Sequence, residues 1–149
     1  MYQVANDVSI HDFMQGYKTA WEQRDEAMFA ALFTADGEYS NTPFVVQRGH
    51  IQLSEYWRRV KLQEDVHVTF EVLASADQSG IAHWHVTYQV ASEELFQIWA
   101  KSSGTHLIAR EPGAPLPCMV LDGMLMAEFE SDGLCKQCRI WWHSMPQVS

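Results

Sequence analysis

The apolar positions of the chain follow a helical spacing in its first third and a strand-like alternation in most of the rest. An apolar stripe from Phe13 to Trp21, at steps of three and four residues, predicts an amphipathic helix that begins at Ser9. Asp25 is placed to cap a second helix, and another apolar face predicts a helix over residues 51–60. Alternation predicts strands at residues 38–44, 66–76, 81–91 and in both arms of the segment 120–144.

The segment 120–144 carries the strongest strand signal. Its two arms flank a tight turn at Ser131-Asp132-Gly133, and each arm is apolar on both faces. Such arms are typical of central strands that are covered on both sides, so we expect the N-terminal helices to pack against this hairpin. Helices gathered on one side of a largely antiparallel sheet define an α+β architecture.

Three segments interrupt these elements. Residues 34–37 predict a turn, and residues 47–50 predict a loop that leads into the third helix. Residues 92–117 are ambiguous, because their start fits either a short helix or an extension of the preceding strand, and their proline-rich end is typical of a loop. The length of this segment supports the hypothesis of a lid over a cavity mouth.

Composition narrows the class of protein. A chain of 149 residues fits one domain, residues 1–149. The net charge of −9 argues against a nucleic-acid partner, which requires a basic surface. We expect no signal peptide, no membrane span and, with three cysteines, no disulfide framework, so a cytoplasmic location is predicted.

Four local motifs, in their order and spacing, resemble the NTF2-like superfamily and within it the SnoaL-like group. They are Trp21-Glu22-Gln23-Arg24-Asp25 with Leu32-Phe33, then Tyr39-Ser40-Asn41-Thr42-Pro43-Phe44, then Gly49-His50-Ile51 before Tyr56-Trp57, and Leu121-Asp122-Gly123 with Phe129, Gly133 and Trp141-Trp142. The resemblance implies a strongly curved antiparallel or mixed sheet that wraps, with the helices, around a conical pocket. It also implies a homodimer formed through the convex face of the sheet. This superfamily includes cyclases, isomerases, dehydratases, epoxide hydrolases and proteins that only bind, so the fold alone does not settle the function.

Tyr39 and Asn41 are the first candidate catalytic residues. They resemble the Tyr and Asn that hold the attacking water in the epoxide hydrolases, and strand alternation places them on one face. The alternative is a core aromatic residue and a turn residue before Pro43. Ile140 falls where that family carries its water-activating Asp, so at most part of the machinery is present.

His83 and His85 form the second candidate pair, because two residues apart on a strand they share a face. Facing inward, a neutral imidazole could act as a general base. Facing outward, the pair would be surface residues while Trp84, Val86 and Tyr88 line the interior, and this apolar set favours the outward orientation.

Neither a metal nor a cofactor is expected. His67 could approach the two histidines, but no acid or cysteine is obviously near to complete a zinc site. Cys135 and Cys138 have C-x-x-C spacing, yet residues three apart on a strand face opposite sides, so their sulfurs are expected to diverge.

The orientation of the hairpin decides two further roles. If the face of Asp122, Met124, Met126 and Glu128 lines the pocket, Glu128 is a buried carboxylate of raised pKa. If it faces outward, the methionines form a dimer surface. Arg139, Trp141 and His143 alternate with Cys138, Ile140 and Trp142 along the second arm. The resemblance to the epoxide hydrolases implies that Cys138, Ile140 and Trp142 point inward and that Trp141 lies on the convex face.

These observations predict a protein that holds a small, mostly apolar molecule, with no specific reaction assignable. Asn41 with His83 or His85 would supply polar anchors. The alternative is a cofactor-independent acid–base enzyme such as a hydratase, isomerase, cyclase or epoxide hydrolase. The predicted ligand-binding residues are Tyr17, Trp21, Tyr39, Trp57, Glu128 and Trp142.

Overall fold

One mixed sheet organises the part of the chain that the computed structural model describes, residues 3–94 and 115–147. The strand order is β2-β1-β6-β5-β4-β3, and every neighbouring pair is antiparallel except β1 with β6. The elements in chain order are α1 (Gln3–Glu22), α2 (Glu26–Ala30), β1 (Phe33–Thr42), β2 (Val45–Arg48), α3 (Gly49–Trp57), the 3-10 helix η1 (Arg58–Leu62), β3 (Gln63–Ala76), β4 (Ser79–Val90), β5 (Cys118–Phe129) and β6 (Cys135–Pro146).

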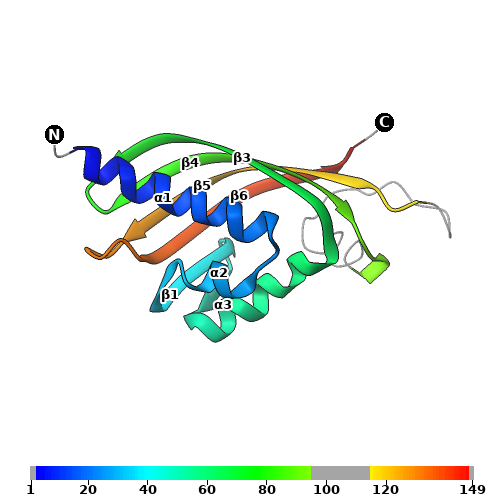
Figure 1. Cartoon of the computed structure of the whole chain (residues 1–149), viewed down its shortest axis with the longest axis horizontal. Helices are drawn as coiled ribbons and strands as arrows, with labels where there is room; N and C mark the ends of the chain where they lie inside the picture. Colours follow the sequence, from blue (N-terminus) through cyan, green and yellow to red (C-terminus); the bar gives the residue numbers. More distant parts are fainter. Residues whose placement is uncertain (1–2, 95–114, 148–149) are drawn as a thin grey trace.

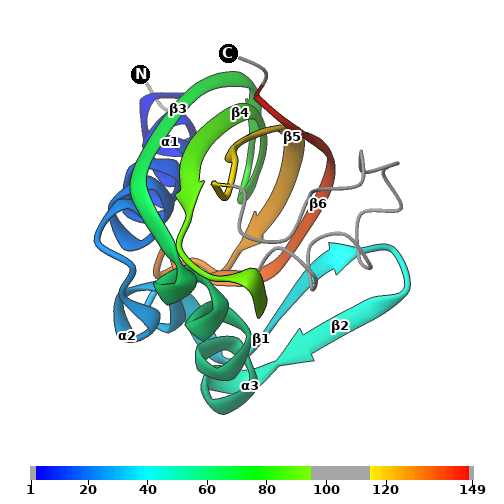
Figure 2. The same ribbon diagram turned by 90° about the vertical axis from the view of Figure 1, so that its right-hand side faces the viewer.

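The sheet is strongly curved, and the helices lie on its concave side (Figure 1). Figure 2 shows strands β3 to β6 as an arc, with α1 and α2 beside it and the β1–β2 hairpin projecting below. Phe13 of α1 contacts Phe33 of β1 and Phe129 of β5, with ring centroids 5.9 and 5.6 Å apart. The predicted α+β architecture, with a curved mixed sheet and helices on one side, is confirmed.

Side chains at and just after the end of α1 hydrogen-bond to backbone groups of the edge strand β3 at Val68 and Gln63. Lys18 Nζ donates to the Val68 carbonyl at 2.7 Å, and Glu22 Oε2 accepts from the Val68 N–H at 3.0 Å. Arg24 donates to the Gln63 carbonyl at 3.0 Å. Burial would raise the pKa of Glu22, but its hydrogen bonds to Val68 and Lys18 outweigh burial and lower it. This helix is therefore attached to the sheet by polar contacts as well as by its apolar face.

The concave side of the sheet is filled by aromatic rings. Trp57 stacks on Phe29 with centroids 3.9 Å apart and an interplanar angle of 5°. Trp21 packs between Trp57 and Trp84 at 5.4 and 5.6 Å, and Tyr17 contacts Trp21 at 5.6 Å. All five side chains are buried. The deep part of the cone is therefore a solid core at these residues.

Several predicted boundaries differ from the structure. Helix α1 begins at Gln3 and not at Ser9. Residues 34–37 are part of β1, because pairing with β6 at Phe33 and again from Glu38 holds them in the strand through an irregularity. Residues 45–48, near the start of the predicted loop, form β2 through pairing with β1. In both cases pairing between strands overrides local turn preference.

Two local predictions are confirmed. The Asp25 side chain caps α2 by accepting from the N–H groups of Ala27 and Met28. The turn between β5 and β6 contains Gly133 at φ 89°, a conformation that favours glycine.

The β5–β6 hairpin is central in the sheet, but the helices cover only one of its faces. On the other face Met126 and Trp141 are 40% and 42% exposed. The expectation of cover on both sides is therefore wrong for a single copy of the chain. The hypothesis of a lid at residues 92–117 falls mainly on residues outside the described ranges.

Candidate functional site

A hollow opens where β1 separates from β6. Ser40 pairs with Arg139, and beyond this point β1 turns away toward β2 at Pro43, which has no N–H to continue a ladder. The Trp142 indole N–H donates to the Asn41 carbonyl across the gap at 2.8 Å. The hollow has a volume of about 710 Å³ and is lined by Asn41, Thr42, Pro43, Phe44, Val45, Gln47, Tyr56, Arg59, Ile140, Trp141, Trp142 and His143. Volumes of this order are usual for small-molecule sites.

Asn41 supplies a buried polar atom to this wall. Only 8% of the residue is exposed, and its Oδ1 has no hydrogen-bond partner within the described residues. Hydrogen bonding from the Asn41 side chain acts to lower the pKa of the Tyr56 phenol, while Asn41 Oδ1 itself stays unpartnered. An unsatisfied buried acceptor costs about 1–3 kcal/mol, so this atom is poised for a donor from outside the chain.

Arg59 is fixed beside Tyr56. Its Nε donates to the Tyr56 carbonyl at 3.1 Å, and its guanidinium carbon lies 4.0 Å from the centroid of the same residue's ring. In the ranges the structure describes, Arg59 makes no ion pair with a carboxylate. Burial raises the pKa of Tyr56, and the Arg59 charge and the Asn41 hydrogen bond oppose this only in part. The phenol therefore stays protonated at neutral pH.

Four of the predicted pocket residues lie in the core. Tyr17 and Tyr39 are buried and share a hydrogen bond of 3.0 Å between their hydroxyls. Burial raises the pKa of both phenols. Trp21 donates its indole N–H to Gln63 Oε1 at 2.7 Å, and Trp57 stacks on Phe29. Of the predicted wall, Trp142 faces the hollow.

The side chains of Tyr39 and Asn41, the predicted water-holding pair, lie in different parts of the structure. Asn41 lines the hollow, whereas the Tyr39 hydroxyl is occupied by Tyr17 in the core. The geometry therefore does not bring the Tyr39 hydroxyl and the Asn41 amide to one water.

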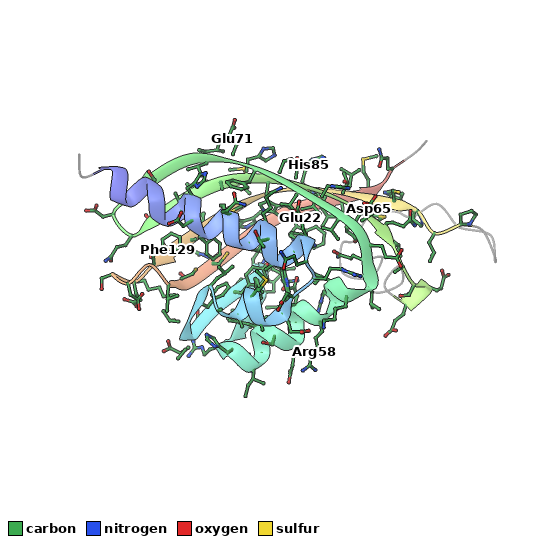
Figure 3. The ribbon with its side chains drawn as sticks, viewed as in Figure 1. Glu22, Arg58, Asp65, Glu71, His85 and Phe129 are labelled. Carbon is green, nitrogen blue, oxygen red and sulfur yellow. The ribbon has the colours of Figure 1, made fainter. Side chains whose placement is uncertain are left out.

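His83 and His85 lie on the outer face of the sheet, the orientation favoured by the sequence. Figure 3 shows His85 on the side of the sheet away from the helices. His83 Nε2 lies 2.8 Å and His85 Nδ1 3.1 Å from the two carboxylate oxygens of Asp122. Partial burial would raise the pKa of Asp122, but the hydrogen bonds and charges of the two histidines outweigh it and lower it. This arrangement does not support a role for the pair inside the hollow.

Glu128 also belongs to the outer face. It alternates with the buried residues Ala127 and Phe129, and it lines a shallow depression with Gln137 and Arg139. The structure thus resolves the open orientation of the hairpin, and a role for Glu128 in the hollow is not supported.

The prediction that the sulfurs of Cys135 and Cys138 diverge is wrong. Phe129 pairs with Cys135 while Glu128 pairs with Gln137, so Lys136 is an extra residue that bulges from β6. The bulge turns both thiols to the buried side. Burial and a hydrogen bond with Cys135 raise the pKa of the Cys138 thiol, so it is a poor nucleophile.

Within residues 3–94 and 115–147 no set of three or more His, Cys, Asp or Glu side chains is arranged to hold a metal ion. No helix in these ranges has the length and apolar content that a bilayer crossing requires.

Tyr56 and Arg59 are the site residues that the sequence analysis missed. Tyr56 was included only in the predicted helix over residues 51–60 and in the motif with Trp57, and Arg59 was given no role. Their spacing of three residues places them on one side of a helix, which is the signal that could have identified them.

The concave sheet, the covering helices and the hollow define an NTF2-like α+β cone. The SnoaL-like domain family matches residues 14–136, and the chain belongs to this family. A comparison with curated proteins finds no significant match.

Solved structures that share this fold include two enzymes and a hypothetical protein. A hexachlorocyclohexane dehydrochlorinase has a TM-score of 0.68 at 10% identity, over 99% of this chain and 92% of that one. SalBIII, an epoxide hydrolase/cyclase-like enzyme in pyran ring formation of salinomycin, has a TM-score of 0.66 at 12% identity, over 92% and 95%. A hypothetical protein from Catenulispora acidiphila, with a ketosteroid isomerase-like fold and bound trimethylamine, has a TM-score of 0.63 at 16% identity, over 88% and 85%. At these identities the likeness shows the fold alone.

Proposed function

We propose that this protein binds a small, mostly apolar molecule in the hollow between β1, β6 and α3. The observation that carries the proposal is the buried, unpartnered Oδ1 of Asn41 beside Tyr56 and Arg59. Apolar side chains of Phe44, Val45 and Ile140 surround these polar groups, as is usual for small-molecule pockets.

We further propose that the ligand leaves unchanged. Proton abstraction needs a base within hydrogen-bond reach of the reacting atom. Tyr56 has a raised pKa, Arg59 is permanently charged, and Ile140 occupies the position where the epoxide-hydrolase segment carries its Asp. His143 lines the hollow from an exposed strand position that alternates outward.

A tryptophan at Val45 should obstruct the hollow. Val45 lines it and is 48% exposed, so the V45W variant adds a large ring without disturbing the core. We expect the affinity for 1-naphthol, measured by calorimetry, to fall by about tenfold or more. That corresponds to the loss of about 60–100 Å² of apolar contact, about 1.5–2.5 kcal/mol.

The neighbouring V46W variant is the matched control. Val46 is similarly exposed on the same strand but does not line the hollow, so its affinity should stay within about twofold of wild type. Equal affinities in all three proteins would place binding elsewhere. Molecules eluted from the protein and identified by mass spectrometry should be unaltered, and a converted product would favour the acid–base alternative.

We also propose that two copies associate through the convex face of the sheet. Trp141 pairs with Met124 across β6 and β5, Met126 is its neighbour on the same face, and both exposed side chains lie where none of the helices in residues 3–94 covers the sheet. Exposed aromatic side chains that anchor an interface commonly contribute about 2 kcal/mol or more to the free energy of association. Trp141→Glu should therefore weaken dimerisation by at least about 30-fold in analytical ultracentrifugation.

Leu134→Glu is the control for that measurement, because Leu134 is exposed in the β5–β6 turn, away from this face. A wild-type chain that sediments as a monomer at all concentrations would overturn the proposal.

The three cysteines, none paired in the structure, favour a reducing compartment such as the cytoplasm, which cell fractionation would check.

A further inference from the structure

We infer that the ligand of the hollow is an apolar 2-hydroxy carboxylic acid. In this assignment Arg59 and Tyr56 bind the carboxylate, and Asn41 accepts a hydrogen bond from the adjacent hydroxyl. The inference rests on the proposed function, because it names the chemical class of the molecule that the same hollow takes.

The first argument is the unpaired cation. Arg59 Nε is occupied by the Tyr56 carbonyl, so the two terminal nitrogens of the guanidinium remain as a fork of donors. That fork is immobilised over the Tyr56 ring before any ligand arrives. The chain has 19 acidic and 10 basic side chains, yet none of the described carboxylates pairs with this arginine. A planar guanidinium held in this way matches the two oxygens of a carboxylate.

The second argument is the hydrogen bonding around the phenol. Tyr56 and Asn41 line the same hollow, and the Tyr56 O–H can donate its proton to an anion there. Asn41 Oδ1 can only accept, so the group next to the anion must be a donor. A carboxylate with a hydroxyl on the adjacent carbon presents an acceptor and a donor side by side, as these two residues require.

The third argument is the wall around this polar set. The Trp142 indole, Ile140 and the β1–β2 hairpin residues Phe44 and Val45 leave apolar surface for the rest of the molecule. A fully polar metabolite would leave this surface in contact with polar groups, whereas an aryl or alkyl chain would bury it.

The test uses three probes that differ by one group, titrated into the whole chain by calorimetry. They are 3-phenyllactate, 3-phenylpropanoate, which lacks the hydroxyl, and 3-phenylpropanamide, which lacks the charge. We expect 3-phenyllactate to bind tightest. Loss of the hydroxyl should lower the binding affinity about two- to tenfold, and loss of the charge should lower it about ten- to a hundredfold.

The Arg59→Gln variant should bind 3-phenyllactate about ten- to a hundredfold more weakly than the wild-type chain does. Its affinity for 3-phenylpropanamide should be nearly unchanged. Arg58→Gln is the matched control, because Arg58 is exposed and points to solvent in Figure 3. Asn41→Ala should make 3-phenyllactate and 3-phenylpropanoate bind equally, and circular dichroism verifies that each variant is folded.

Three results would overturn the inference. The first is equal binding of the acid and the amide by the wild-type chain, and the second is an Arg59→Gln variant that keeps full affinity for 3-phenyllactate. Binding of 1-naphthol but of none of the three probes would also overturn it, while leaving the proposed function intact. A hollow that fails to bind 1-naphthol, with V45W indistinguishable from wild type, would instead remove the proposed function.

Discussion

Replacing Trp57 by alanine is expected to lower the free energy of unfolding by about 3–5 kcal/mol. Trp57 is 2% exposed and stacks on Phe29, with Tyr17 and Trp21 at 5.5 and 5.4 Å. Its indole N–H also donates to the Ala20 carbonyl at 3.4 Å. Truncation would leave a large cavity among rigid rings that cannot collapse to fill it. Urea denaturation followed by far-ultraviolet circular dichroism measures the loss.

The control is Ile51→Ala on the same helix. Ile51 is 76% exposed, so its truncation should change the free energy of unfolding by no more than about 0.5 kcal/mol. The total free energy of unfolding of a typical domain is only about 5–15 kcal/mol, so the W57A variant should unfold at a clearly lower urea concentration than the wild-type chain. A loss below about 1.5 kcal/mol would mean that the ring cluster is not packed as described.

The Gly123→Val substitution is expected to lower the free energy of unfolding by about 3 kcal/mol or more. A Cβ atom at Gly123 would lie 2.6 Å from Trp84 Cζ2 and 2.7 Å from the Trp141 carbonyl oxygen. The first contact is with a buried ring and the second with the backbone of a paired strand, so neither can move cheaply. Overpacking of a core typically costs 1–3 kcal/mol, and a branched side chain adds two more methyl groups here.

Met124→Val on the same strand is the comparison for Gly123→Val. Met124 is half-buried on the opposite face, where valine suits a strand, so we expect a change below about 1 kcal/mol. Thermal unfolding of both variants by calorimetry decides the matter. Equal midpoints for Gly123→Val and wild type would show that the sheet is looser at this point than the structure indicates.

Much of the fold could be predicted because its local signals agree with its packing. The Asp25 cap and the Asp132-Gly133 turn each satisfy backbone groups within a few residues, so the sequence reveals them directly. Strand β2 escaped prediction because its four residues are held by pairing with β1, a contact that no local pattern records. The Cys135–Cys138 pair escaped for a similar reason, since a single bulged residue reverses which face a side chain occupies.

The candidate site was harder to predict than the fold. Alternation shows that His83 and His85 share a face, but only the burial of the neighbouring Trp84 and Val86 shows which face that is. Aromatic residues such as Trp21 were assigned to a pocket wall because a side chain that fills a core and one that lines a cavity have the same composition and spacing. Arg59 was missed because a charged residue at the end of a helix is ordinarily solvated.

The polar contacts of α1 with β3 have a consequence for how copies of the chain can meet. An uncovered border strand is a template on which another chain can add its own strand, and repeated addition yields open-ended fibres. At one border the N–H and carbonyl of Val68 are already occupied by Glu22 and Lys18. At the other border β2 spans only Val45–Arg48, too short to recruit a stable partner strand. These contacts discourage strand addition at Val68 and at the short β2 border, so the proposed association of two copies would use a face of the sheet, where it can close after two copies.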